Sequence, residues 1–131
     1  MKFSTRTTYG LRAMIRLVKN KEAMSLPKIA KMEGISLGYL ERLFSKLKKR
    51  GLIEASLGMK GGYILAKKAK DVSVFDIVDS LEEGISMFHC LNNAGKVVCP
   101  AKSKCGASIV LSKVQRSVYE TLKNIKLSEI L

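Results

Sequence analysis

The chain has 131 residues, 47% of them hydrophobic, and its 24 Lys and Arg against 11 Asp and Glu give a formal net charge of +13. This length predicts one domain with an appended element, and the apolar content excludes an intrinsically disordered chain. The excess charge lies in one half, because residues 1–70 contain 17 Lys or Arg and 4 Glu, whereas residues 71–131 contain 7 of each sign. Such an asymmetry favours a polyanion, most often nucleic acid, bound by the first half over a merely solubilising surface.

Three helices are predicted in the first fifty residues. Residues 8–19 repeat apolar positions with the period of an amphipathic helix. Ser25 can cap a short second helix that ends at Gly34, and Ser36 can cap a third helix over residues 37–50. The expected inward-facing residues are Leu11, Met14, Ile15 and Val18 in the first helix, Ile29, Ala30 and Met32 in the second, and Leu40, Leu43, Phe44 and Leu47 in the third.

A β-hairpin and a fourth helix are predicted next. Leu52–Ala55 and Tyr63–Ala66 are β-prone and flank a stretch of seven residues that contains three glycines. Asp71–Glu83 is expected to be helical because Ser73 and Asp76 form a capping-box pattern. The expected inner face of this helix consists of Ile77, Val78 and Leu81.

Helix, short helix, four-residue turn, helix and glycine-rich hairpin follow one another in the order of a winged helix-turn-helix. We therefore predict a mainly α fold with a small β wing, in which the helix over 37–50 enters the major groove and the wing approaches the adjacent backbone or minor groove. The candidate DNA-contacting residues are Ser36, Gly38, Tyr39, Glu41, Arg42 and Lys46 around the recognition helix, Lys60, Gly61, Gly62 and Tyr63 in the hairpin, and Arg6 near the N-terminus.

Glu41 has two interpretations. A carboxylate is repelled by phosphates unless it accepts a hydrogen bond from a cytosine amino group, so its place on the outer face of the recognition helix points to base readout. The alternative is a surface salt bridge to Lys48, Lys49 or another neighbour. Arg42 and Lys46 can bind guanine edges or phosphates.

Residues 106–126 are predicted to form a long helix of about 30 Å, at about 1.5 Å per residue. Its apolar residues follow the spacing of a two-helix seam: Leu111, Val114, Val118, Leu122 and Ile125. We expect a symmetric dimer through this helix that binds a pseudo-palindromic site in double-stranded DNA, with half-sites about 34 Å apart. The alternative is packing on the winged domain of the same chain.

All three cysteines lie in one loop, at the spacing C-x8-C-x5-C: Cys90, Cys99 and Cys105. Metal or iron–sulfur binding, redox thiols and inert thiols all remain open from this spacing, because it lacks the paired C-x2-C of zinc sites. His89 is adjacent to the first cysteine and is expected to stay off the same metal. An odd cysteine count argues against a disulfide scaffold, and the absence of an apolar leader or long apolar run predicts a cytoplasmic protein without a membrane segment.

The chain resembles the Rrf-two family of bacterial winged-helix regulators, the IscR/NsrR type. The matching stretches are STRTTYGLRAM, ISLGYLERLFSKLKKRGLIEAS, KGGYILA, VSVFDIVDSLE and the cysteine loop before a long helix that ends IKLSEIL. The resemblance implies a homodimer with crossed long helices, and a 2Fe–2S or 4Fe–4S cluster on the three cysteines that senses iron–sulfur status, nitric oxide or redox state.

The chain departs from the family pattern at several positions. Ser108 stands where biogenesis regulators carry a histidine ligand, and Thr8 stands where nitric-oxide sensors can use an aspartate, so the fourth cluster ligand is unassigned. Leu57 replaces the usual wing-tip arginine and Gly38 replaces a recognition-helix serine. Glu41 matches the base-reading glutamate of the family.

We therefore predict three parts: a winged helix-turn-helix domain over 1–83, a cysteine loop over 84–105, and a dimerisation helix with its tail over 106–131. The expected function is a homodimeric DNA-binding regulator, in the first place a repressor, controlled by an iron–sulfur cluster. One rival is a regulator of the same fold controlled by thiol oxidation or a partner protein. Another is an interaction module or small metalloenzyme, although no nucleophile–base set supports catalysis.

Overall fold

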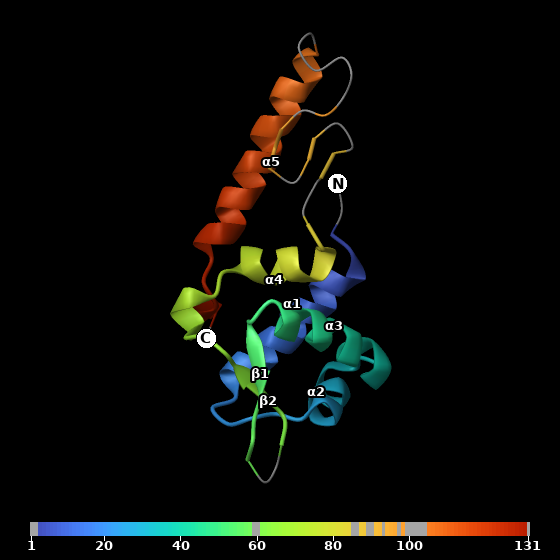
Figure 1. Cartoon of the computed structure of the whole chain (residues 1–131), viewed down its shortest axis with the longest axis vertical. Helices are drawn as coiled ribbons and strands as arrows, with labels where there is room; N and C mark the ends of the chain where they lie inside the picture. The colour runs from blue at the N-terminus through green and yellow to red at the C-terminus, as the bar shows by residue number, and fades with distance from the viewer. Residues whose placement is uncertain are drawn as a thin grey trace.

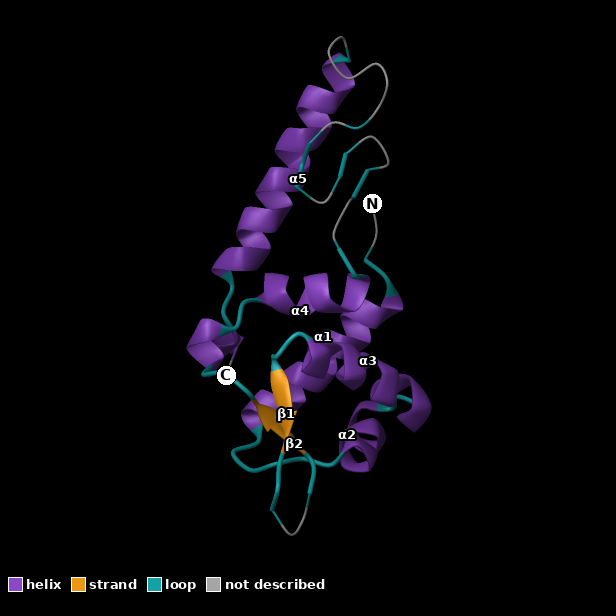
Figure 2. Ribbon diagram, in the orientation of Figure 1, coloured by secondary structure: helices purple, strands orange, loops and turns teal. Residues whose placement is uncertain are grey.

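The protein is described by a computed structural model, which covers residues 3–58, 61–84, 87–88, 91–92, 94–96, 98 and 105–130. Figures 1 and 2 show a helical body with a small hairpin at one end and a long helix rising from the other. In chain order the elements are α1 (Thr5–Lys19), α2 (Leu26–Glu33), α3 (Leu37–Lys49), β1 (Ile53–Ala55), β2 (Tyr63–Leu65), the 3-10 helix η1 (Ala69–Asp71), α4 (Val74–Glu82), α5 (Gly106–Asn124) and the 3-10 helix η2 (Leu127–Ile130). This order confirms the predicted mainly α fold with a β wing.

The helix boundaries in the first half follow local capping chemistry. The Ser25 and Ser36 hydroxyls accept hydrogen bonds from the backbone N–H groups at the starts of α2 and α3, as predicted. Gly34 ends α2 at φ 65°, in the left-handed region that glycine enters freely. The prediction for Met32 was wrong: its side chain is 48% exposed, because α2 is turned so that the neighbouring Glu33 faces the arginines of α1.

The wing is an antiparallel pair in which Glu54 lies opposite Ile64. Tyr63 also pairs with Met24 in the α1–α2 connection, through N–H to carbonyl hydrogen bonds of 2.8 and 3.1 Å. Gly62 makes this contact possible, because a Cβ at this position would lie 2.5 Å from the carbonyl carbon and oxygen of Met24. Its φ of 105° also favours glycine.

The larger of two apolar clusters joins α1, α2, α3, the wing and α4, and it buries Phe44, Met14 and Leu81 almost completely. Helices α1 and α4 approach so closely that a Cβ on Gly10 would lie 2.1 Å from a methyl carbon of Leu81. The predicted inner faces of α3 and α4 are confirmed, since all of their expected residues are buried. This packing fixes the position of α3 and leaves its opposite face to solvent.

Helix α4 begins later than predicted, at Val74, because the capping box of Ser73 and Asp76 sets its first turn and residues 69–71 form η1 instead. The end of α5 is joined to this start: Val74 N–H donates to the Ile125 carbonyl at 2.8 Å. From there α5 extends away from the winged body, so its N-terminal end lies far from the wing (Figure 1).

Candidate nucleic-acid interface

The outer face of α3 forms a shallow, open hollow on the surface of the winged body. Its lining residues are Gly38, Glu41, Arg42, Ser45 and Lys46, four of which are in the predicted DNA-contacting set. Arg42 and Ser45 are exposed, while the buried residues of the same helix anchor it in the core. The structure therefore brings the predicted recognition residues together on one accessible helical face.

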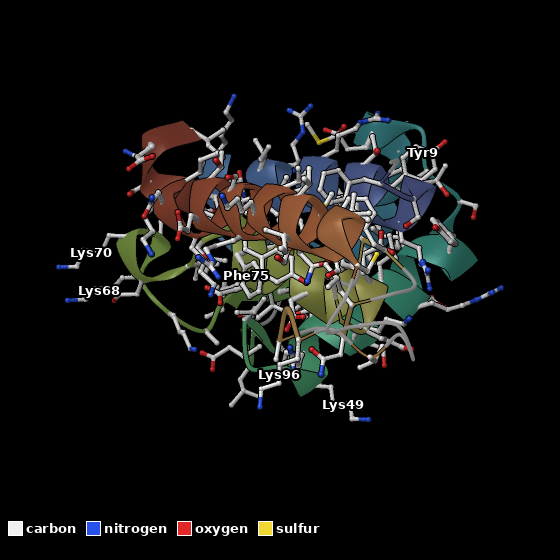
Figure 3. All side chains as sticks on the ribbon, turned by 90° about the horizontal axis from the view of Figure 1, so that it is seen from above. Tyr9, Lys49, Lys68, Lys70, Phe75 and Lys96 are labelled. Carbon is white, nitrogen blue, oxygen red and sulfur yellow. The ribbon has the colours of Figure 1, made fainter. Side chains whose placement is uncertain are left out.

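Glu41 is exposed on this face, and among the described residues it forms no ion pair. Lys48 and Lys49 form no ion pair with it, although both are exposed about two turns further along α3. Figure 3 shows Lys49 extending from α3 into solvent. An unpaired carboxylate among cations favours the base-readout interpretation over the salt-bridge alternative.

Several other predicted contact residues also have structural roles. The Tyr63 ring packs edge-on against Phe44, with ring centroids 5.4 Å apart, and the Tyr39 ring meets Tyr9 at 5.9 Å. Lys60 lies outside the described residues. Leu57 at the wing is fully exposed, so an apolar side chain occupies the place of the arginine expected from the family pattern.

The C-terminal end of α4 carries three carboxylates that pair with cations of the first half, which sequence reasoning missed. Asp79 pairs with Arg50, Glu82 with Arg6 at 3.5 Å, and Glu83 with Lys46 at 2.8 Å. Burial disfavours ionisation of Glu82, but hydrogen bonds from Ser4 and Thr7 and the charge of Arg6 outweigh it and hold the pKa of its carboxyl below the usual range. The Lys46 ammonium likewise lowers the pKa of Glu83.

Glu82 should therefore stabilise the fold in a pH-dependent way. Because its pKa is lower in the folded than in the unfolded chain, its contribution is present above the unfolded pKa of about 4.3 and is lost as the pH falls through the folded pKa. We expect Glu82→Gln to lower the free energy of unfolding by about 1–3 kcal/mol at neutral pH, and by much less at about pH 3. Urea denaturation at both pH values measures the difference. The exposed Glu22 gives the control Glu22→Gln; a loss for Glu82→Gln that is equal at both pH values would contradict the assignment.

The cysteine loop is described only in part. Cys105 is a free, half-buried thiol immediately before α5, whereas Cys90, Cys99 and His89 lie outside the described residues. Ser108 is 2% exposed and its hydroxyl donates to the Cys105 carbonyl at 2.7 Å. Thr8 is exposed on α1. Within the described part of the chain, which leaves out Cys90 and Cys99, no group of three or more His, Cys, Asp or Glu is placed to hold a metal ion.

Gln115 of α5 fastens the described part of the loop to this helix. It is 1% exposed, its side-chain oxygen accepts from Met87 N–H at 3.1 Å, and its amide nitrogen donates to the Asn92 carbonyl at 3.1 Å. Asn92 in turn closes a tight turn by accepting from the backbone N–H groups of Ala94 and Lys96. Gln115 thereby attaches the chain on both sides of position 90 to α5. The sequence did not predict this role for Gln115, because it shows only a glutamine beside the apolar seam.

Gln115→Ala should release the loop without unfolding the winged body. The substitution leaves the Met87 N–H without its described partner, at a cost of about 1–3 kcal/mol, whereas the Asn92 carbonyl keeps the Gly95 N–H at 2.9 Å and loses only one of its two donors. Hydrogen exchange measured by mass spectrometry should show faster exchange in peptides that cover residues 87–96, and unchanged exchange in α3. Ser117→Ala, at an exposed position of the same helix, is the matched control, and unaltered loop protection in Gln115→Ala would contradict the attachment.

The apolar seam of α5 is divided between two environments. Near its C-terminal end, Leu122 and Ile125 pack with Tyr119 against Val74 and Val78 of α4, and Figure 3 shows Phe75 beneath the same helix. The seam residues nearer its N-terminal end, Leu111, Val114 and Val118, are half-exposed and belong to neither core cluster. Ile109 and Val110 are each 60% exposed. Among the described residues, packing on the same chain therefore accounts for the last part of the seam only.

The two-helix motif, its antiparallel wing and the accessible cationic face of α3 define a winged helix-turn-helix protein. The profile of the Rrf2 family, described as an iron-dependent transcriptional regulator, matches residues 3–131. The chain belongs to this family, the one its motifs resemble. It is 33% identical to Protein rrf2 of Nitratidesulfovibrio vulgaris over 133 residues, covering 100% of this chain and 87% of the relative. It is 32% identical to the HTH-type transcriptional regulator IscR of Escherichia coli, covering 99% and 80%.

Solved structures give the same result. The IscR of T. potens superposes with a TM-score of 0.79 at 32% identity, covering 99% of this chain and 85% of that one. CymR of B. subtilis, titled the global cysteine regulator, also superposes at 0.79 and 32% identity, covering 99% and 95%. The family description and the names of Escherichia coli IscR and of CymR all describe regulators, and the chain is accordingly a transcription regulator. None of the described helices is both long and apolar enough to cross a membrane.

Proposed function

We propose that the protein is a homodimeric regulator that inserts α3 into the major groove of double-stranded DNA and is controlled through its cysteine loop. The observation that carries DNA readout is the outer face of α3, where unpaired Glu41 stands beside exposed Arg42. A carboxylate in that place suits a cytosine amino group, and an arginine suits guanine or a phosphate. The wing, with Lys60, Gly61, Gly62 and Tyr63, would then lie against the neighbouring backbone, and Arg6 and Ser36 would lie near the phosphates.

Dimerisation is supported by the unfilled part of the α5 seam. Val114 and Val118 continue the spacing of Leu122, yet no described residue of the core clusters covers them. A second copy of the same helix would bury this stripe and would place two recognition helices on one pseudo-palindromic site.

An iron–sulfur cluster on Cys90, Cys99 and Cys105 is the proposed sensor. Three thiols in one loop fit the donor chemistry of such clusters, and Cys105 is a free thiol at the start of α5. When bound, the cluster would supply a centre that reacts with oxidants or nitric oxide. Ser108 does not offer a ready fourth ligand, because its buried hydroxyl is directed to the Cys105 carbonyl.

Thiol oxidation without a cluster is the second candidate. CymR of Staphylococcus aureus, 33% identical and superposing at a TM-score of 0.73, has a structure titled as an oxidized form. Under this alternative the same three cysteines would respond to peroxide and dithiothreitol and not to iron.

The DNA interface is tested with Arg42→Ala on the full chain. The wild type should bind a duplex of about 30 base pairs, selected by it from a random pool, with an affinity that falls steeply as salt rises. We expect Arg42→Ala to weaken this binding about 10-fold to 100-fold, because one guanine or phosphate contact is lost. Fluorescence anisotropy on the selected duplex and on a scrambled duplex separates base readout from phosphate contact.

Lys113→Ala is the matched control, since Lys113 is an exposed cation on α5 away from the winged body. Equal binding by the wild type and Arg42→Ala would remove α3 from the interface. Binding of the wild type that is absent or insensitive to salt would instead favour an interaction module.

A further inference from the structure

Two of the predicted DNA-contacting cations form ion pairs within this chain, and their carboxylate partners are neighbours in the sequence. Arg6 of α1 and Lys46 of α3 meet Glu82 and Glu83, which are adjacent at the C-terminal end of α4. Glu82 is the more buried of the two and holds the start of α1 through Ser4 and Thr7. Glu83, by contrast, has a side chain that is 69% exposed. Among the described residues it forms one ion pair, with Lys46.

Lys46 lies at the boundary of two surface hollows. One is the outer face of α3, where it lies beside Arg42 and Ser45. The other is a hollow of about 450 Å³ between α3 and α4, where it faces Glu83 and Gly84. A single long side chain can therefore direct its ammonium either toward the DNA side of α3 or toward the end of α4.

The Lys46–Glu83 pair is suited to open. Both side chains are partly exposed, at 29% and 69%, and exposed ion pairs contribute little to stability because solvent screens them. While the pair is closed, a carboxylate at 2.8 Å neutralises the ammonium and also presents negative charge toward any approaching phosphate. A phosphate contact from Lys46 then requires the pair to open.

Glu83 is also the residue from which the cysteine loop departs. It ends α4 with φ 58°, in the left-handed region that a non-glycine residue seldom occupies, and Gly84 follows at φ 111°. The position of the Glu83 carboxylate therefore depends on how the chain leaves α4, and the next hydrogen bonds to α5 are those of Met87 and Asn92 with Gln115.

We propose that Glu83 competes with the DNA backbone for Lys46, acting as an internal substitute for a phosphate that lowers DNA affinity. This inference rests on the proposed function, in which α3 is the DNA-reading helix. A shift of Glu83 away from α3 frees Lys46 for DNA, and a shift that presses Glu83 onto α3 makes Lys46 unavailable to DNA. The end of α4 is thus coupled to the recognition helix through one ion pair.

A double-mutant cycle on the full chain tests the competition, with wild type, Glu83→Gln, Lys46→Gln and the double variant. Binding is measured by fluorescence anisotropy on the duplex that the wild type selects, over a series of salt concentrations. Glu83→Gln should tighten binding about threefold to tenfold and steepen the salt dependence by about one released counterion. Lys46→Gln should weaken binding about as much, and adding Glu83→Gln in that background should change nothing.

Glu120→Gln is the matched control, because it removes the same charge at an exposed position of α5 and should leave affinity unchanged. The competition is overturned if Glu83→Gln leaves binding unchanged or weakens it. It is also overturned if the tightening persists in the Lys46→Gln background, or if Glu120→Gln reproduces it, since either result indicates a general charge effect. Failure of the wild type itself to bind DNA would refute the proposed function and the competition with it, whereas normal wild-type binding with no gain in Glu83→Gln refutes the competition alone.

Discussion

Gly62→Ala should destabilise the protein by about 2–4 kcal/mol and detach the wing from the body. Two effects act together at this position. The new Cβ would lie 2.5 Å from the Met24 carbonyl and 2.9 Å from the Ser25 nitrogen, and these backbone atoms cannot turn aside as a side-chain end would. The φ of 105° is also one that alanine rarely adopts. Urea denaturation monitored by circular dichroism gives the free energy of unfolding.

Gly61→Ala separates the two effects. Gly61 also has a positive φ, of 61°, but nothing lies within 4 Å of the position that its Cβ would take. We therefore expect a smaller loss, of about 1–2 kcal/mol, from the left-handed backbone alone. Equal losses for the two variants would show that the close approach of the hairpin to Met24 is not the reason for glycine at position 62.

Replacing Val114 and Val118 together with glutamate should convert a dimer into a folded monomer. Both valines are half-exposed and belong to neither core cluster, so the winged body should keep its stability. Two carboxylates in the seam would have to lose their hydration against the partner helix, which is strongly unfavourable. Losing the second half-site should weaken binding to the selected duplex by about 100-fold or more, because the linked subunits no longer raise each other's effective concentration.

Sedimentation velocity reports the oligomeric state, and Ser117→Glu, at an exposed position off the seam, is the control for added charge on α5. If the doubly substituted protein sediments as the wild type does, the seam is not the dimer interface. If both variants become monomers, charge and not the seam controls association.

The winged fold could be predicted from local patterns because each boundary has a local cause. Ser25, Ser36 and Ser73 begin helices where the sequence places cap residues, and Gly34 ends one. Met32 shows where this reasoning fails. Helical periodicity alone permits it to face inward, but the ion pairs of Glu33 with Arg12 and Arg16 join residues 17 or more positions apart and turn α2 the other way.

The residues of the candidate site also fall into those that local sequence patterns predict and those that they do not. Gly38, Glu41, Arg42 and Lys46 could be placed on one face because they lie within a single helix. The carboxylates that pair with Arg6 and Lys46 could not be predicted from the sequence. The contact of α4 with α1 and α3 depends on tertiary packing, and the paired residues are 37 and 76 positions apart in the sequence. The same holds for Gln115, whose buried hydrogen bonds to Met87 and Asn92 cross from one element to another.

The most direct test compares DNA binding by two states of the cysteine loop. The full chain, purified anaerobically and reconstituted with iron and sulfide, is titrated onto the selected duplex beside the same preparation stripped of iron, with the Cys90→Ala, Cys99→Ala, Cys105→Ala triple variant in both treatments. The proposed function predicts visible absorption from bound iron–sulfur in the wild type, and a Kd that differs at least about tenfold between its two states, a coupling of about 1.4 kcal/mol. The triple variant should show one Kd under both treatments. A colourless wild type, or the same Kd in both of its states, would contradict control of DNA binding by a cluster.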